Sequence, residues 1–215
     1  MTSDTTTAAT GSTPTNSAST CGAVAQVDCI DPRVARSRRA VLEAATDLLV
    51  ESGARAVTVD AVSERSGVAK STMYRHWESR TALLVDVVGS NIPELPGPDP
   101  ELGFEAGLRV LVHEVAEALG TPEWAALMPA LMTLKQQVPE LRELSEGDTE
   151  RKIGVLADVL ERGVAEGALP ADLDPWTVGT VLIGPVIFSL VSGRLAEVHD
   201  VAEFAVERFL ASYRT

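Results

Sequence analysis

The sequence has few aromatic side chains and almost no cysteine. Aromatic residues make up 4% of its 215 residues, and Cys21 and Cys29 are the only cysteines. These two have no CxxC spacing and no Cys/His cluster beside them, so neither a zinc site nor a disulfide framework is predicted. Residues 1–30 contain no Lys or Arg and no apolar core segment, unlike a secretory signal. Their Thr, Ser, Ala and Gly content predicts a disordered leader on a cytoplasmic protein.

Segments that alternate β-branched and polar residues are scarce, whereas Ala, Val and Leu are abundant. Hydrophobic residues make up 45% of the chain, which is enough for a globular core. An all-α fold is therefore expected, with one or two domains at this length. No Ser/His/Asp grouping, metal-ligand spacing or phosphate loop occurs, and His76, His113 and His199 have no evident catalytic companions. We expect no enzyme activity, no catalytic residues, no metal and no cofactor.

A long uncharged hydrophobic run occurs once. Residues 176–193 include 18 positions without a charge, which is about the lower limit for a membrane span. Gly179, Gly184 and Pro185 interrupt the run, and no basic cluster borders it. We expect a helix that is buried by its own core and by a partner subunit, and no membrane span.

Positive charge is scarce overall, since the net charge is −13, but the acidic excess is uneven. Residues 31–90 carry nine Lys or Arg against eight Asp or Glu, whereas residues 91–215 carry nine against 21. The affinity of a protein for DNA depends on the cations at the contact. The segment 31–90 is therefore compatible with DNA binding, and the acidic segment 91–215 is not expected to touch DNA.

Residues 58–77, TVDAVSERSGVAKSTMYRHW, have the pattern of two short helices joined by a tight turn at Ser66-Gly67. Met73 and Trp77 lie four residues apart and are expected to share a buried stripe. The other positions of the second helix carry hydrogen-bonding side chains suited to phosphates and base edges: Lys70, Ser71, Thr72, Tyr74, Arg75 and His76. This pattern predicts a helix-turn-helix whose second helix lies in the DNA major groove.

Cations flank this unit on both sides. A helix predicted from about Pro32 to Ser52 begins with four arginines, Arg33, Arg36, Arg38 and Arg39, which suit either a solvated helix end or DNA phosphates. Thr58 is placed to cap the next helix, whose N-terminus is also a site for a phosphate. Arg80 lies in the first turn of a helix capped by Ser79, where a cation is unfavourable without an anion beside it.

A proline-rich segment, residues 92–100, is the predicted boundary between a DNA-binding domain (31–90) and a C-terminal domain (91–215). The sequence after it predicts helices over 101–119, 122–137, 140–145, 149–166, 175–193 and 198–213. Asp174 followed by Pro175 is a clear helix start.

With this order of elements, the chain resembles the tetracycline-repressor (TetR/AcrR) family of bacterial transcription regulators. The matching residues are a first helix ending in ESG (51–53), Thr58, Val62-Ser63, Ser66-Gly67-Val68, Tyr74-Arg75-His76-Trp77, Ser79, Arg80 and Leu83. The chain has Ser63, Ala69, Trp77 and Arg80 where the family usually has Ala, Ser, Phe and Lys. Ala69 removes the usual cap of the second helix, at a cost of about 1 kcal/mol unless Ser66 or Ser71 compensates.

The resemblance implies a homodimeric repressor on a palindromic double-stranded operator, released by a small-molecule effector. It makes Thr58, Tyr74, His76 and Arg80 candidates for phosphate contacts, and Lys70, Ser71, Thr72 and Arg75 candidates for base contacts. The dimer would form through the helices 175–193 and 198–213. Large apolar or adaptable side chains are candidates for an effector pocket, although side chains of this kind at helical spacing more often belong to the core: Phe104, Leu108, His113, Trp124, Leu127, Met128, Leu131, Met132 and Trp176.

One alternative stays open at this point. A regulator of the same fold could activate transcription, or could answer a protein partner instead of a small ligand. Such a protein would have an occluded C-terminal domain and would not leave DNA when a ligand binds.

Overall fold

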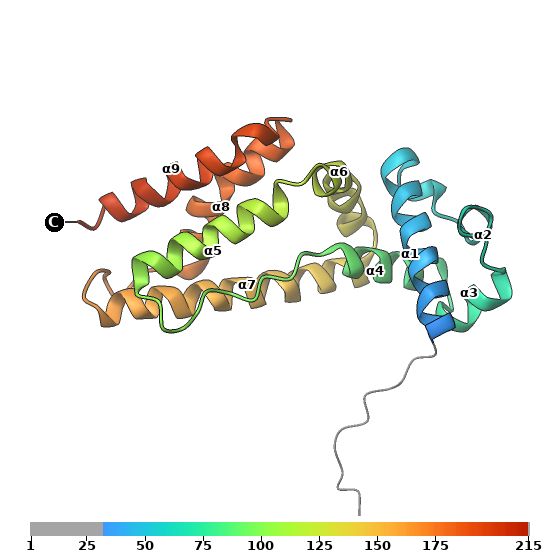
Figure 1. The fold of residues 1–215 in the computed structure, drawn as a ribbon, viewed down its shortest axis with the longest axis horizontal. Helices are drawn as coiled ribbons and strands as arrows, with labels where there is room; N and C mark the ends of the chain where they lie inside the picture. Colours follow the sequence, from blue (N-terminus) through green and yellow to red (C-terminus); the bar gives the residue numbers. More distant parts are fainter. Residues whose placement is uncertain (1–31, 215) are drawn as a thin grey trace, which may run out of the picture. The chain divides into compact units, whose positions relative to one another are not determined.

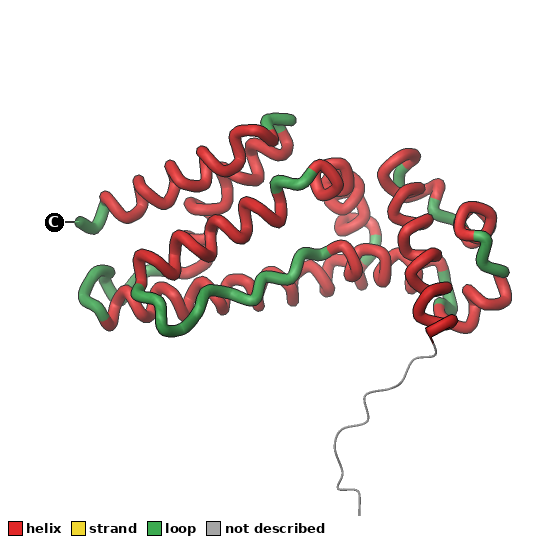
Figure 2. Tube along the Cα trace, viewed as in Figure 1, coloured by secondary structure: helices red, strands yellow, loops and turns green. Residues whose placement is uncertain are grey.

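A computed structural model describes residues 32–214, and within that range the ordered elements are helices, with no strand (Figures 1 and 2). The predicted all-α fold is confirmed. The predictions for residues 1–30, including those for Cys21 and Cys29, lie outside the described residues.

The N-terminal helices are α1 (Pro32–Ser52), α2 (Val59–Ser66), α3 (Lys70–His76) and α4 (Arg80–Asn91), with a 3₁₀ turn at Ala54–Ala56. Local signals set their ends. The hydroxyl of Thr58 accepts a hydrogen bond from Ala61 N, and that of Ser79 accepts one from Ala82 N, so both predicted caps are present. Gly67 ends α2 with φ of 68°, a left-handed conformation that glycine adopts without strain.

The C-terminal helices are α5 (Phe104–Leu119), α6 (Pro122–Gln137), α7 (Pro139–Ala165), α8 (Pro175–Val191) and α9 (Val198–Ala211). Helix α5 begins at Phe104 and not at residue 101. At that point the carboxylate of Glu166 accepts a hydrogen bond from Phe104 N at 2.9 Å, so a distant side chain sets the start of the helix.

Helix α7 corrects the prediction of two separate helices over 140–145 and 149–166. It runs unbroken through 27 residues, and the Thr149 hydroxyl donates to Ser145 O within it. The predicted interruption contains Gly147 but no proline, and a single glycine weakens a helix without breaking it. Tertiary packing at both ends of α7 explains its continuity.

Two hydrophobic cores organise the helices. One joins buried residues of α5, α7, α8 and α9, including Phe104, Leu108 and Leu182. The other joins α1 to α4, and Leu127, Leu131, Leu134 and Leu141 of α6 and α7 also belong to it. The core of α1 to α4 is therefore completed by residues from beyond the proline-rich segment.

No helix within residues 32–214 combines the length and the apolar character that crossing a membrane requires. Helix α8, which contains most of the uncharged run, is 17 residues long.

Candidate DNA-binding surface and effector cavity

Helix α3 has one buried face and one exposed face. Met73 is 2% exposed and Trp77, at its C-terminal cap, is 6% exposed, which confirms the predicted anchor. On the other side, Ser71, Tyr74, Arg75 and His76 are exposed and Thr72 is half-buried. The exposed groups are hydroxyl, guanidinium and imidazole donors, so the helix presents a hydrogen-bonding surface fixed by two buried side chains.

Ala69 makes no side-chain cap for α3, as expected from its methyl group. Two serines stabilise the preceding turn. Ser63 Oγ donates to Val68 O at 2.8 Å, and Ser66 Oγ accepts from Val68 N at 3.2 Å. These bonds hold the turn between α2 and α3, although neither reaches the first amides of α3.

Lys70, at the start of α3, pairs with Asp60 in the first turn of α2, with 2.5 Å between Nζ and Oδ1. The hydrogen bond to Asp60 raises the pKa of Lys70 above its ordinary value, so the ammonium stays charged at neutral pH. To reach a base, this ammonium must leave or share the carboxylate. The pair is exposed, which makes that exchange inexpensive.

The arginines of α1 differ in their surroundings. Arg36 is exposed, and Arg39 lies 3.8 Å from Glu43 on the same helix. Arg38 donates to both carboxylate oxygens of Asp86 at 2.6 and 2.7 Å, and Asp86 also accepts from Trp77 Nε1 at 2.8 Å. Arg38, His76, Trp77 and Asp86 line one small cleft, so the structure brings a predicted phosphate-contacting cation beside the end of α3.

Arg80 is held by backbone atoms. Its Nε donates to Val57 O at 2.7 Å, and Nη2 donates to Ala54 O. The guanidinium thereby connects the first turn of α4 to the loop before α2. Thr58, the N-cap of α2, directly follows that loop. These hydrogen bonds explain how a cation is accommodated at a helix N-terminus, and its contact with a phosphate stays a prediction.

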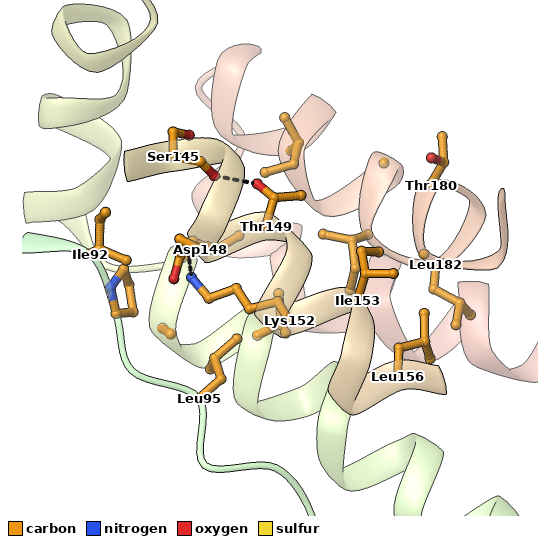
Figure 3. Close-up of a pocket in the computed structure, with 18 of the residues that line it drawn as sticks. Ile92, Leu95, Ser145, Asp148, Thr149, Lys152, Ile153, Leu156, Thr180 and Leu182 are labelled. Atoms are coloured by element: carbon orange, nitrogen blue, oxygen red, sulfur yellow. Dashed lines mark hydrogen bonds and ion pairs between the residues drawn. The ribbon is translucent and has the colours of Figure 1, made fainter. Parts of the chain in front are cut away.

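A cavity of about 550 Å³ lies among α4 to α8 (Figure 3). Val88 and Ile92 from the end of α4 contribute to it, as do apolar residues of α5, α6 and α8. The lining is mostly apolar, which is typical of small-molecule sites.

Polar groups of the cavity come mainly from α7. Lys152 Nζ lies 2.6 Å from Asp148 Oδ2, and Figure 3 shows this pair beside Thr149 and Ile153. Asp148 is only 16% exposed at its side chain and also pairs with Arg151 at 3.2 Å. Thr180 of α8 donates to Trp176 O, so its oxygen can still accept a hydrogen bond.

The sequence-predicted pocket residues fall into two groups. Trp124, Met128, Leu131, Met132 and Trp176 line the cavity. The others lie elsewhere: Phe104 and Leu108 in the core of α5 to α9, Leu127 in the core of α1 to α4, and His113 exposed on α5.

Sequence reasoning did not select Asp148, Thr149, Lys152 or Thr180. Asp148 and Lys152 have the i, i+4 spacing of an ordinary surface ion pair, so their spacing carries no signal of a cavity. Only the continuous path of α7 brings them beside α5 and α8.

Helices α8 and α9 leave large apolar side chains uncovered. Phe188 is 71% exposed and Phe204 is 65% exposed, and Val181, Val191 and Trp176 are also exposed. Isolated exposed apolar residues are common in proteins, but five large ones on two adjoining helices form an unusual surface.

Comparison with known proteins agrees with this geometry. Residues 41–87 match the model of the bacterial regulatory proteins of the tetR family, and residues 102–209 match the tetracyclin repressor-like C-terminal domain. The chain is 28% identical over 163 residues to the uncharacterized HTH-type transcriptional regulator YdeS of Bacillus subtilis (strain 168), which covers 74% of this chain and 81% of that protein. It is 26% identical over 146 residues to the HTH-type transcriptional repressor KstR2 of Rhodococcus jostii (strain RHA1), which covers 64% and 70%.

Solved structures share the fold. A TetR transcriptional regulator from Agrobacterium tumefaciens superposes with a TM-score of 0.65 at 23% identity, covering 83% of this chain and 94% of the other. The family and these relatives are transcriptional regulators and not enzymes. The predicted helix-turn-helix and family are therefore confirmed, and the chain belongs to the TetR family of DNA-binding transcriptional regulators.

Proposed function

We propose that this chain is a homodimeric repressor that binds a palindromic double-stranded operator and leaves it when a small molecule fills the cavity. The observation that supports this most directly is the position of α4. Val88 in its last turn and Ile92 directly after it line the cavity, while Arg80 in its first turn holds the loop before α2.

The route from cavity to DNA follows α4. Asp86, in the middle of that helix, binds both Arg38 of α1 and Trp77 at the end of α3. A displacement of α4 by an effector therefore moves groups that position α3. An effector that prefers the displaced arrangement shifts the population away from the DNA-binding form.

The exposed apolar surface of α8 and α9 supports the dimer. A second copy placed by a two-fold axis would cover Phe188 and Phe204 with the same surface of its partner. The two α3 helices would then contact half-sites separated by roughly one DNA turn, about 34 Å, or a little more.

The cavity lining suggests the chemistry of the effector. A mainly apolar molecule would fill the space, and one polar group would meet the Asp148–Lys152 pair or the oxygen of Thr180. Lys152 retains donors beyond the one directed at Asp148, so an acceptor on the effector suits this end.

A gel-shift titration with the DNA that flanks its own gene, over a series of salt concentrations, tests the proposal. We expect sequence-dependent binding that weakens with salt, and release when a hit from a thermal-shift screen is added. Arg75→Ala should remove specific binding. Glu161→Gln, at an exposed position of α7, should not. Binding without sequence preference would contradict the proposal of a specific operator. Binding that no effector weakens would contradict the proposal of effector-induced release.

A further inference from the structure

A row of charged side chains runs along the contact between α5 and α9. On α5 the row is spaced by four residues, Glu105, Arg109, His113 and Glu117, and on α9 it is His199, Glu203 and Glu207. Residues four apart on a helix share a face, so the two rows lie opposite each other.

Most of this row is closed by short ion pairs. Arg109 Nη1 lies 2.7 Å from Glu203 Oε1, and its other nitrogen pairs with Glu207. Arg214, after the end of α9, lies 2.7 Å from Glu105 Oε2. These contacts match cations with carboxylates across the two helices.

The far end of the row differs, because two imidazoles and one carboxylate meet there. The rings of His113 and His199 have centroids 5.3 Å apart, and a ligand atom of each lies within 4.8 Å of the others and of Glu117. All three side chains are exposed. An ion pair with Glu117 needs only His199, so charge pairing does not explain the presence of His113.

The distance between His199 and Glu117 also suits two ligands of one metal ion. Nε2 and Oε2 are 3.3 Å apart, which is longer than a charge-assisted hydrogen bond of about 2.7–2.9 Å. Two ligands of one tetrahedral zinc ion, each about 2.0–2.1 Å from the metal, lie roughly 3.3 Å apart. A ring nitrogen of His113 lies within 4.8 Å of both of these atoms.

We propose that His113, Glu117 and His199 form a surface site for a divalent transition metal ion of the zinc type. Two imidazoles and a carboxylate are ligands that zinc favours, whereas magnesium and calcium favour oxygen ligands. Water would complete the coordination. The ligand spacing carries no recognisable motif, because His199 follows Glu117 by 82 positions.

The site lies on a different face of α5 from the effector cavity. Val112, Val115 and Leu119 line the cavity, while His113 and Glu117 face α9. A bound ion would therefore fasten the C-terminal part of α5 to the start of α9 without entering the cavity. It would stabilise the folded chain by binding that state in preference to the unfolded one.

Metal titration of the untagged full chain tests the site, with Cys21 and Cys29 replaced by serine to remove thiolate ligands. Zinc should raise Tm and saturate at one ion per chain. Cobalt(II) at the same site should give visible d–d absorption without a thiolate charge-transfer band. His113→Ala, His199→Ala and Glu117→Gln should each weaken binding by about tenfold or more.

Glu161→Gln is the matched control, since it removes an exposed carboxylate of α7 and should leave metal binding unchanged. Circular dichroism would show that the variants, all at exposed positions, remain folded. An absent or unsaturable response to zinc, an equal response from magnesium, or full binding by a His113→Ala/His199→Ala double variant would overturn the proposal. DNA binding is measured separately, so failure here leaves the proposed repressor untouched.

Discussion

At the scale of single residues, the cations near the DNA-binding surface divide by what they already hold. All four arginines are exposed, but Arg38 and Arg80 also donate to Asp86 and to backbone carbonyls, respectively, unlike Arg36 and Arg75. An engaged cation also determines where α1, α3 and α4 lie. Substitutions at these two kinds of arginine should therefore differ in their effect on stability.

Asp86→Ala should destabilise the protein by about 1–3 kcal/mol, because it leaves the indole N–H of Trp77 without its acceptor and releases Arg38. Chemical denaturation of the variant and the parent would measure this. Asp60→Asn is the control, because its ion pair with Lys70 is exposed and should contribute little to stability. Equal stability of Asp86→Ala and the parent would contradict the role of this carboxylate.

The Lys70–Asp60 pair makes a second prediction, for DNA affinity. Lys70→Ala should weaken operator binding and reduce its salt dependence, because the variant loses a cation at the DNA contact. Asp60→Asn should tighten binding, because it frees Lys70 and removes a negative charge beside the DNA. Fluorescence anisotropy over a salt series measures both. Weaker binding by both variants would show instead that the pair positions α3.

At the scale of helices, the two glycines of α7 at positions 154 and 163 differ in how closely other helices pack against them. A Cβ added at Gly163 would lie 2.8 Å from Phe104 Cγ and 2.8 Å from Leu169 Cδ1, whereas one added at Gly154 would meet no atom within 4 Å. The two glycines share a helix but not an environment. Gly163 permits α5 to approach α7, and Gly154 faces open space.

Gly163→Ala should therefore destabilise the protein by about 1–3 kcal/mol through overpacking. Gly154→Ala, its matched control, should be neutral or should stabilise by up to about 1 kcal/mol, since alanine favours a helix. Thermal and urea unfolding of both variants would decide. Similar effects of the two changes would mean that the contact between α5 and α7 is looser than described.

The cap of α8 makes a prediction for pH. Hydrogen bonds from the hydroxyl and the backbone N–H of Thr177 hold the pKa of Asp174 below its ordinary value of 3.8. A depressed pKa adds stability above the ordinary value, and that stability is lost as pH falls through the folded-state value. Asp174→Ala should thus lower Tm at pH 7, and the difference should narrow in acid. Asp172→Ala controls for net charge, and a difference independent of pH would refute the account.

Helices with local start and stop signals could be predicted from the sequence, and those that depend on distant contacts could not. Thr58, Ser79 and Asp174 mark caps within their own segments, and each cap is present. The start of α5 depends on Glu166, 62 positions away, and has no such mark. The candidate site divides in the same way. The exposed face of α3 follows from its own sequence pattern, whereas the place of the Asp148–Lys152 pair in the cavity depends on contacts with distant helices.

At the scale of the whole molecule, the uncovered surface of α8 and α9 is where the proposed dimer would form. Phe188 and Phe204 are among the most exposed large apolar residues of the described chain. In a dimer they would be buried, and each subunit would supply one DNA-reading helix. Operator affinity should therefore depend on the assembly of two copies.

Phe188→Glu combined with Phe204→Glu should give a monomer in size-exclusion chromatography with light scattering. Operator affinity should fall by roughly a hundredfold, because two linked contacts become one. Val110→Glu, at an exposed apolar position of α5, is the control and should remain dimeric. A parent protein that is itself monomeric, or a double variant that stays dimeric, would place the interface elsewhere or remove it.

The unbroken course of α7 has a mechanical consequence. Leu141 near its start packs in the core of α1 to α4, and Leu160 near its end packs in the core of α5 to α9. A helix of 27 residues is about 40 Å long at 1.5 Å per residue. Asp148 and Lys152, between those ends, line the cavity. If α7 moves as one rigid rod, a tilt of about 5° at one core would move its far end by about 3.5 Å at the other.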